Sequence, residues 1–312
     1  MTSALLPRET TTGTPAVGLS CPLCRGALRD MAAGHECGLC GRRFPSSAAQ
    51  RDFRLRAGDE IRYEVRYTPL VYDAAIDVPL QCEAPCPEPR NRLRGDIPVH
   101  LTAAQVSYIP ETTRGGIALD LGCGHGIHRS VLERLGYRYF GADYSGPAAQ
   151  DLVDAHALPY ADQWFDLVLS VAVIEHLSHP YRALAEVHRV LKPGMCFIGT
   201  AAFLEPFHDN SFAHLSHLGL WQALRTSGFI VDAIMPIAGW HAVRAQVEMG
   251  FGARLPGWVT SGVSRPFGWA IESYAALGRM LNRHSDRHRR ELVRARHAGA
   301  FFFAARREPA AC

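Results

Sequence analysis

The fold of this 312-residue chain follows from the stretch Ile117-Ala118-Leu119-Asp120-Leu121-Gly122-Cys123-Gly124-His125-Gly126. An apolar run stops at an acidic residue, three glycines follow at every second position, and 127–135 then reads as a helix. This order predicts a strand, a tight glycine turn and a helix start. A ligand can lie against the backbone of such a turn because glycine has no Cβ. The amides of the helix N-terminus favour a negatively charged ligand group.

The spacing of the glycines argues against a dinucleotide fingerprint, because G-x-G-x-x-G counted from Gly122 would need a third glycine where Ile127 stands. The run reads Asp-x-Gly-x-Gly-x-Gly instead. It resembles the first motif of the class I S-adenosylmethionine (SAM) dependent methyltransferases, in which the glycine turn faces the methionine part of the cofactor. A glycine turn without a ligand is the alternative. The resemblance implies that SAM contacts Asp120, Gly122, Cys123, Gly124 and Gly126.

Strands and helices alternate from residue 117 onward, which predicts a mostly parallel sheet with helices on both faces. The resemblance implies a Rossmann-like methyltransferase sheet of seven strands, whose last strand, around 300–305, inserts antiparallel next to strand six. The fold class is therefore α/β, with a small zinc ribbon before the sheet. The other strands are expected at Ile117–Leu121, Tyr137–Ala142, up to Asp154, Phe165–Ser170, Cys196–Thr200 and Phe229–Ile234.

Two further acidic residues end strands of this predicted sheet. Asp143 follows the second strand, where a carboxylate can accept hydrogen bonds from ribose hydroxyls. Asp154 follows the third, where the resembled family contacts the adenine amino group. Plain surface aspartates are the alternative. Only 144–150 separates these strands, so the usual helix between them must be missing or a single turn. The residues expected to bind SAM here are Asp143, Tyr144, Asp154, Ala155 and His156.

The segment from Trp164 to Gly194 carries the closest resemblance. It contains Phe165-Asp166, Glu175-His176-Leu177 and Arg189-Val190-Leu191-Lys192-Pro193-Gly194, and it departs from the family at Met195, where a second glycine is usual. This phrase is similar to type 11 methyltransferases. The residues after the fourth strand must reach the carboxyl edge of the sheet, where ligands bind in open α/β folds. Ser170, Val171 and His176 are therefore expected at the cofactor.

Residues 203–217 must reach the same edge, and they contain three histidines. Histidine titrates near neutral pH and can take a proton from an acceptor hydroxyl or amine. His208, His214 and His176 are the candidates for this catalytic role. Loop hydrogen bonds or a helix cap are the alternative for these side chains. A second alternative is a metal site built from His208, Asp209, His214 and His217.

Two C-x-x-C pairs near the start predict a metal site. Four thiolates at this spacing can surround one ion tetrahedrally, and zinc is preferred over an iron site or a redox pair. A closed four-cysteine site has no open position for substrate, so its role is structural. The segment resembles the Trm112-like zinc ribbons that precede some methyltransferase domains. The zinc ligands are Cys21, Cys24, Cys37 and Cys40.

The rest of the chain divides by composition. We expect a flexible tail at 1–17, the ribbon at 18–53, a linker and cofactor-lid region at 54–113, and the methyltransferase domain at 114–312. The lid is expected as a helix around Asp59–Tyr67 carrying Tyr63, Tyr67 and Tyr72, although these rings could equally pack the ribbon onto the main domain. A second short helix is expected at 100–107. A helical insertion at 239–297, without clear periodicity in its first part, is expected to cover the acceptor as a substrate cap.

The end of that insertion is rich in arginine. Five arginines at steps of three and four predict one basic helical face, which suits either solvent or a partner bearing phosphate. They are Arg279, Arg283, Arg287, Arg290 and Arg294.

Composition limits the function classes. The formal net charge of +3 is too small to imply nucleic acid by itself. No signal peptide and no run long enough to span a membrane are recognised, so a cytoplasmic protein without a membrane partner is expected. An odd total of nine cysteines argues against a disulfide framework.

The predicted function is a SAM-dependent methyltransferase that acts at O or N of a small molecule, such as a secondary metabolite. The first alternative is an RNA methyltransferase, which the ribbon and the arginine face would suit. The second is a non-catalytic scaffold of the same fold that binds a partner through its ribbon. The sequence leaves the acceptor and the oligomeric state open.

Overall fold

The computed structural model describes residues 15–64, 78–81, 86–91, 93, 95–208, 210–281 and 287–309. Its main sheet has eight strands in the order β11-β12-β10-β9-β6-β7-β8-β5. Neighbouring strands are parallel except for β12, which pairs antiparallel with both β10 and β11. The strands are β5 (Arg51–Asp52), β6 (Ile117–Leu121), β7 (Arg138–Asp143), β8 (Asp151–Leu152), β9 (Phe165–Ser170), β10 (Leu191–Ala202), β11 (Phe229–Pro236) and β12 (Ala300–Arg307).

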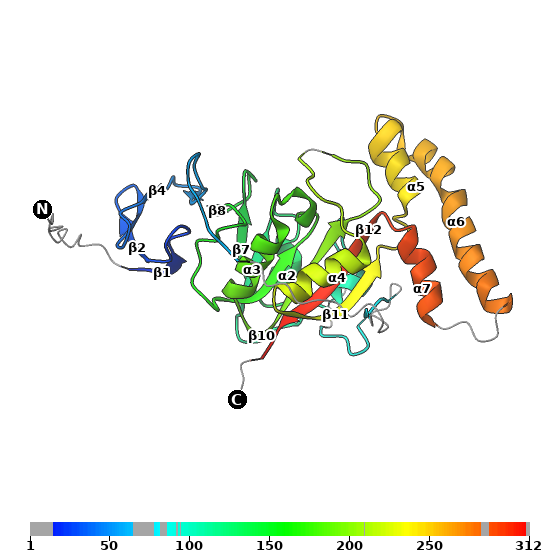
Figure 1. Cartoon of the computed structure of the whole chain (residues 1–312), viewed down its shortest axis with the longest axis horizontal. Coiled ribbons are helices and arrows are strands. Elements are labelled where there is room, and N and C mark those ends of the chain that lie inside the picture. Colours follow the sequence, from blue (N-terminus) through cyan, green and yellow to red (C-terminus); the bar gives the residue numbers. More distant parts are fainter. Residues whose placement is uncertain are drawn as a thin grey trace, which may run out of the picture.

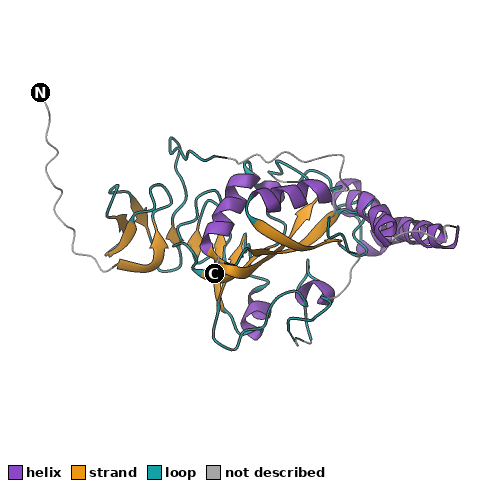
Figure 2. Cartoon of the chain, turned by 60° about the horizontal axis from the view of Figure 1, so that its bottom comes forward, coloured by secondary structure: helices purple, strands orange, loops and turns teal. Residues whose placement is uncertain are grey.

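This sheet confirms the predicted α/β class with its antiparallel last strand. Helices lie on both faces of the sheet (Figure 2). On one face α3 (Pro180–Val190) and α4 (His217–Thr226) bury Leu184 and Leu220. On the other, α1 (Ala103–Val106) and α2 (Arg129–Arg134) bury side chains in a second cluster. The central strands are covered on both sides, which explains why they read as continuous apolar runs.

The ribbon is a four-stranded antiparallel sheet at one end of the molecule (Figure 1). Its chain continues into β5, which adds an eighth strand beside β8. There Arg51 forms a bidentate ion pair with the fully buried Asp151, which also accepts a hydrogen bond from Tyr160. Phe53 is buried in the same cluster as the core of the main sheet. The ribbon strands are β1 (Pro15–Ser20), β2 (Ala27–Met31), β3 (Gly34–Cys37) and β4 (Arg43–Pro45).

The region between ribbon and β6 differs from the expectation of a helical lid. Residues 59–64 are not helical, and 65–67 and Tyr72 lie outside the described residues. The ring of Tyr63 meets the ring of His179 at 6.2 Å, edge to face. The short helix expected at 100–107 is present as α1, and Val106 and Ile109 are buried beneath the sheet. Part of this region therefore belongs to the main core.

The insertion after β11 is helical in its described residues, as expected, and this includes its first part, where the sequence shows no clear periodicity. It holds α5 (Ala242–Ala245), a π-helix η2 (Gln246–Phe251) and the 25-residue α6 (Gly257–Leu281). Then α7 (Arg287–Arg296) returns beside α6 at the end of the molecule opposite the ribbon (Figure 1). No helix among the described residues is long and apolar enough to cross a membrane.

The prediction that five arginines share one helical face is therefore wrong. Arg279 lies on α6, whereas Arg287, Arg290 and Arg294 lie on α7, and Arg283 falls outside the described residues. The two helices lie side by side as separate elements, so the steps of three and four do not run along one helix axis. Arg294 forms an ion pair with Glu272 of α6, so its guanidinium links the two helices.

Candidate active site

The glycine turn after β6 leaves one open stretch of backbone. Gly122, Gly124 and Gly126 all have positive φ, between 51° and 78°, a region that side chains with a Cβ rarely adopt. A Cβ on Gly122 would lie 2.2 Å from Val173. A Cβ on Gly124 would meet nothing within 4 Å. Gly124 therefore presents bare backbone to an accessible space, as a close-fitting ligand requires. Because the turn continues through His128, α2 starts at Arg129, two residues later than expected.

Asp143 ties this turn to the end of β7. Its Oδ2 accepts a hydrogen bond from the Gly124 N–H at 2.9 Å. Its Oδ1 accepts from the N–H groups of Ser145 and Gly146 at 2.9 and 2.8 Å. A carboxylate offers about four acceptor sites, so one site on Oδ2 is left for a ligand hydroxyl. The short 144–150 connection contains no helix, as its length predicts.

Asp154 is bonded to His156. The Asp154 Oδ1 accepts from the backbone N–H and from the ring Nδ1 of His156, at 2.9 and 2.6 Å. The Nε2 of His156 accepts from the His179 N–H at 3.2 Å, which fixes the ring tautomer. Burial opposes the charged form of Asp154, but these bonds from His156 outweigh it and hold the carboxyl pKa below its ordinary value. Asp154 is therefore an anion at neutral pH, able to accept from an amino group.

Asp120 lies beneath the turn and is 1% exposed. Its Oδ2 accepts from the Tyr139 hydroxyl at 3.0 Å, and its Oδ1 has no hydrogen-bond partner among the described residues. Burial, with the charge of Asp143 adding to it, raises the pKa of Asp120 to about 7. The Nε2 of His128 is likewise buried and unpartnered, and burial lowers the pKa of His128 to about 4. Below the glycine turn, Oδ1 of Asp120 and Nε2 of His128 are therefore both buried without a hydrogen bond within the described residues.

Asp120→Asn should stabilise the SAM-free protein in a pH-dependent way. The folded-state pKa of about 7 lies above the ordinary 3.8, so the folded protein binds this proton more tightly. Wild-type stability consequently falls as pH rises from about 4 to 7 and is level above. Asparagine does not titrate, so its advantage should be about 2–3 kcal/mol larger at pH ~8 than at pH ~5. Denaturant unfolding at both pH values tests this, and an equal difference at the two would contradict it.

The predicted histidines converge with a carboxylate that the sequence analysis overlooked. His176 ends the 3-10 turn η1 (Ile174–His176) after β9, and its ring meets that of His208 at 5.2 Å. The carboxylate of Glu175 lies close to both of these histidines. Its Oε2 has no hydrogen-bond partner in the described chain. Burial, helped by the charge of Glu205, raises the pKa of Glu175 to about 7. Its position next to His176 at a strand end was the available signal.

The rings of His208 and His214 have one nitrogen fixed by the backbone. Nδ1 of His208 donates to the carbonyl of Pro206 and Nδ1 of His214 to that of Phe203, both at 3.1 Å. When the ring is neutral, its Nε2 is therefore the acceptor nitrogen. The Nε2 of His214 is buried without a partner within the described residues, and the two ring centroids lie 6.4 Å apart. Both rings can take a proton.

The alternative metal set in this loop is not brought together in the part of it that the structure describes. The ring of His217, at the start of α4, packs against Phe301 with centroids 6.0 Å apart. Asp209 lies outside the described residues. The potential ligand atoms that do gather are those of Glu175, His176 and His208.

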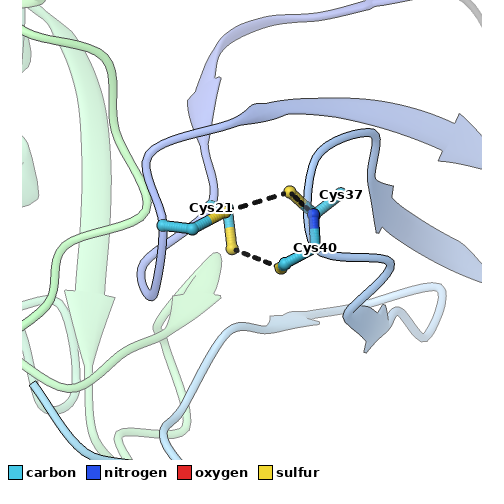
Figure 3. Close-up of side chains that lie close together, drawn as sticks. Cys21, Cys37 and Cys40 are labelled. Atoms are coloured by element: carbon cyan, nitrogen blue, oxygen red, sulfur yellow. Dashed lines mark hydrogen bonds between the residues drawn. The ribbon is translucent and has the colours of Figure 1, made fainter. Parts of the chain in front are cut away.

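The four ribbon cysteines are arranged as metal ligands, and Figure 3 labels Cys21, Cys37 and Cys40. Sγ of Cys21 lies 3.7 Å from that of Cys40, and Sγ of Cys24 lies 3.4 Å from that of Cys37. Zinc–sulfur bonds of about 2.3 Å in a tetrahedron place the sulfurs about 3.8 Å apart. Backbone N–H groups of Leu39 and Cys40 point at the Cys37 sulfur. The donors and their spacing fit one zinc ion.

A cavity of about 570 Å³ lies beyond the ends of β11 and β12, under α6 and α7, and not over the glycine turn. Trp240, Trp269 and Arg294 are among its lining residues. Its volume is in the range that small-molecule sites occupy. Trp240 also donates its indole N–H to Glu205 at 2.5 Å, and Glu205 is the acid whose charge acts on Glu175. The cavity wall therefore connects to the histidine cluster.

Comparisons with known proteins place a methyltransferase signature on the same strands. Residues 119–199 match the family described as a methyltransferase domain. An "Uncharacterized methyltransferase" of Mycobacterium sp. (strain JLS) is 33% identical over 135 residues, which cover 38% of this chain and 54% of that protein. A "Probable tRNA methyltransferase 9B" of Mus musculus is 32% identical over 99 residues, covering 28% and 22%. These findings support a SAM-dependent methyltransferase.

The match is confined to part of each protein, since the chain spans about half the length of the first curated relatives. Among solved structures, a complex between the Haloferax volcanii Trm112 methyltransferase activator and a methyltransferase aligns with 19% identity and a TM-score of 0.42. It covers 65% of this chain and 87% of that one. A likeness at this level adds nothing about substrate or partner.

Proposed function

We propose that the chain transfers a methyl group from SAM to O or N of a small-molecule acceptor. The observation that carries the proposal is the bare backbone at Gly124, held by Asp143 at the carboxyl edge of the sheet. Ligands of open α/β sheets bind at that edge. The methyltransferase-domain match covers this turn.

The residues around the turn suit the parts of SAM. Asp143 keeps an acceptor site for a ribose hydroxyl, and Asp154 is an anion that can accept from the adenine amino group. The unpartnered Oδ1 of Asp120 suits the ammonium of the methionine part. When bound, the cofactor supplies an already activated methyl group, so the chain has to orient the acceptor and exclude water.

The acceptor side is proposed to consist of the cavity and the adjoining polar cluster. His208 and His214 each present an unprotonated Nε2, and the Glu175 carboxyl, with a pKa of about 7, exchanges its proton near neutral pH. These groups can receive the proton that an acceptor hydroxyl or amine releases. The volume of the cavity and the Trp240 ring in its wall favour a small molecule over a polynucleotide.

The zinc ribbon is proposed to be structural. Its thiolates are closed around one point, and its strands share a hydrophobic cluster with the main sheet. Zinc would therefore stabilise the edge of the sheet at β8, next to the segment that carries Asp154.

An RNA methyltransferase is the second candidate, because one relative is a probable tRNA methyltransferase. Methyl-labelled SAM, incubated with the protein and a cell extract, separates the two. Label in the small-molecule fraction is expected. Label confined to RNA would replace the first proposal by the second, and no label in either fraction would contradict both.

A further inference from the structure

We propose that Glu175, His176 and His208 bind a divalent first-row metal ion, at a site separate from the four cysteines. One ligand atom from each residue lies within 4.8 Å of the others. They come from two segments far apart in sequence, η1 after β9 and the loop after β10, and both segments lie at the carboxyl edge of the sheet. The Glu175 carbonyl accepts from the N–H groups of Phe212 and Ala213, which holds the segments together.

The ligand atoms of Glu175 and His208 are free to bind a cation. Glu175 is 2% exposed and its Oε2 has no hydrogen-bond partner in the described chain, an arrangement that costs free energy unless a partner arrives. The Nδ1–H of His208 is bonded to Pro206, which leaves Nε2 as the free donor, and metal-bound histidines are oriented in this way. Glu205 adds a second negative charge nearby.

One carboxylate and two imidazoles suit Zn²⁺, Fe²⁺ or Mn²⁺, and not a soft ion that requires thiolates. Three protein ligands also leave coordination positions open for an acceptor oxygen. With the metal bound, Glu175 and His208 serve as ligands and no longer as proton acceptors, which leaves that role to His214. The acceptor class that fits such a site is a hydroxyl compound, whose proton the metal makes easier to lose. Metal binding itself does not depend on the proposed methyl transfer, since it can be measured without SAM.

The test is equilibrium dialysis of the full chain, its ribbon already zinc-loaded, against Mn²⁺ at about 100 µM. Manganese prefers oxygen and nitrogen donors and does not displace zinc from thiolates. One Mn²⁺ per chain is expected, with at least about tenfold weaker binding in Glu175→Gln and in His208→Ala. The matched control is His214→Ala. Its ring lies in the same loop but is not one of the three proposed ligands, so this variant should bind Mn²⁺ normally.

Two results would overturn the site: no Mn²⁺ and no second Zn²⁺ per chain, or binding that neither Glu175→Gln nor His208→Ala weakens. The glutamine variant keeps the shape of the buried side chain. Its thermal unfolding, compared with the wild type, shows whether a loss of metal reflects a loss of fold.

A separate observation concerns α6, and from it we infer that this helix docks on an anionic lipid surface. Most of the large side chains that α6 exposes are apolar. The side chains it buries include the small, polar Thr260 and Ser264, at 3% and 1% exposure. This is the reverse of a helix that packs its apolar face onto a core. The outward side chains, each 48–79% exposed, are Trp258, Val263, Phe267, Trp269, Tyr274 and Leu277, and Trp269 also borders the cavity.

Composition and charge favour lipid as the occupant. A helix that lies in a membrane interface carries Trp, Phe and Leu on one face and basic residues beside them. Arg254 and Arg265 are exposed next to the apolar face, and their charge complements anionic headgroups. No helix of the described chain spans a membrane, so docking would be peripheral. The cavity under α6 would then open near the surface from which an amphiphilic acceptor could enter.

Co-sedimentation of the full chain with vesicles containing about one third phosphatidylserine tests this. Binding is expected, with a loss of at least about tenfold in the triple variant Trp258→Ser, Phe267→Ser and Trp269→Ser, and no change in Val99→Ser, an exposed apolar control elsewhere. Failure to bind the vesicles would overturn the inference. So would self-association in their absence that the triple variant abolishes, because a second copy would then cover the face.

Discussion

Replacing Cys21 and Cys24 together by serine is expected to remove the zinc ion and to unfold the ribbon. Structural zinc contributes about 10–16 kcal/mol of apparent binding free energy in small metal-dependent folds. That is comparable to the whole free energy of unfolding of a typical domain, ~5–15 kcal/mol. The loss should not stay local, because Phe53 and the Arg51–Asp151 ion pair join the ribbon to the sheet edge. Metal analysis and thermal unfolding measure both effects.

The control for this variant is Cys86→Ser, which alters another buried free thiol outside the tetrahedron. It should retain one zinc ion per chain and shift the unfolding temperature far less. A zinc ion that persists in the double serine variant would show that the ligand set is wrong.

Asp143→Ala should weaken SAM binding about 100-fold or more while the protein stays folded. The substitution removes the proposed ribose acceptor and also three hydrogen bonds that shape the turn, including the one from Gly124. Hydrogen bonds to a charged group are worth about 1.5–3 kcal/mol each, and a 100-fold change in affinity corresponds to about 2.7 kcal/mol. Calorimetric titration with SAM measures the effect.

Asp143→Asn should fall between wild type and alanine, since the amide oxygen still accepts. Glu133→Ala, at an exposed site on α2, is the matched control and should bind SAM normally. If the folded alanine variant bound SAM as tightly as the wild type, Asp143 would have no place in the cofactor site.

Much of the sheet could be predicted because its central strands are long, apolar and bounded by clear turns. The glycine run after Leu121 predicted the turn at the end of the first central strand, and Asp143 marked the end of the next one. The antiparallel β12 followed from the resemblance and is confirmed by its pairing with β10 and β11. In contrast, β5 is two residues long, and its pairing with β8 depends on the tertiary contact of Arg51 with Asp151. Local sequence carries no sign of such a contact.

A helical insertion was expected at 239–297, but the position and length of α6 could not be predicted because α6 lacks an ordinary amphipathic pattern. Its apolar side chains face outward, and Pro266 lies within it, a residue that usually ends helices. Part of the candidate site was missed for a simpler reason. Glu175 was passed over in favour of its neighbour His176, although burial at the end of β9 is what perturbs the carboxyl.

Calorimetry of the wild-type chain with SAM and with its demethylated product tests the central claim most directly. We expect one binding site per chain for each, with a dissociation constant of about 1–100 µM. An absence of binding to either compound at about 1 mM, in a zinc-loaded and folded chain, would contradict the proposed function.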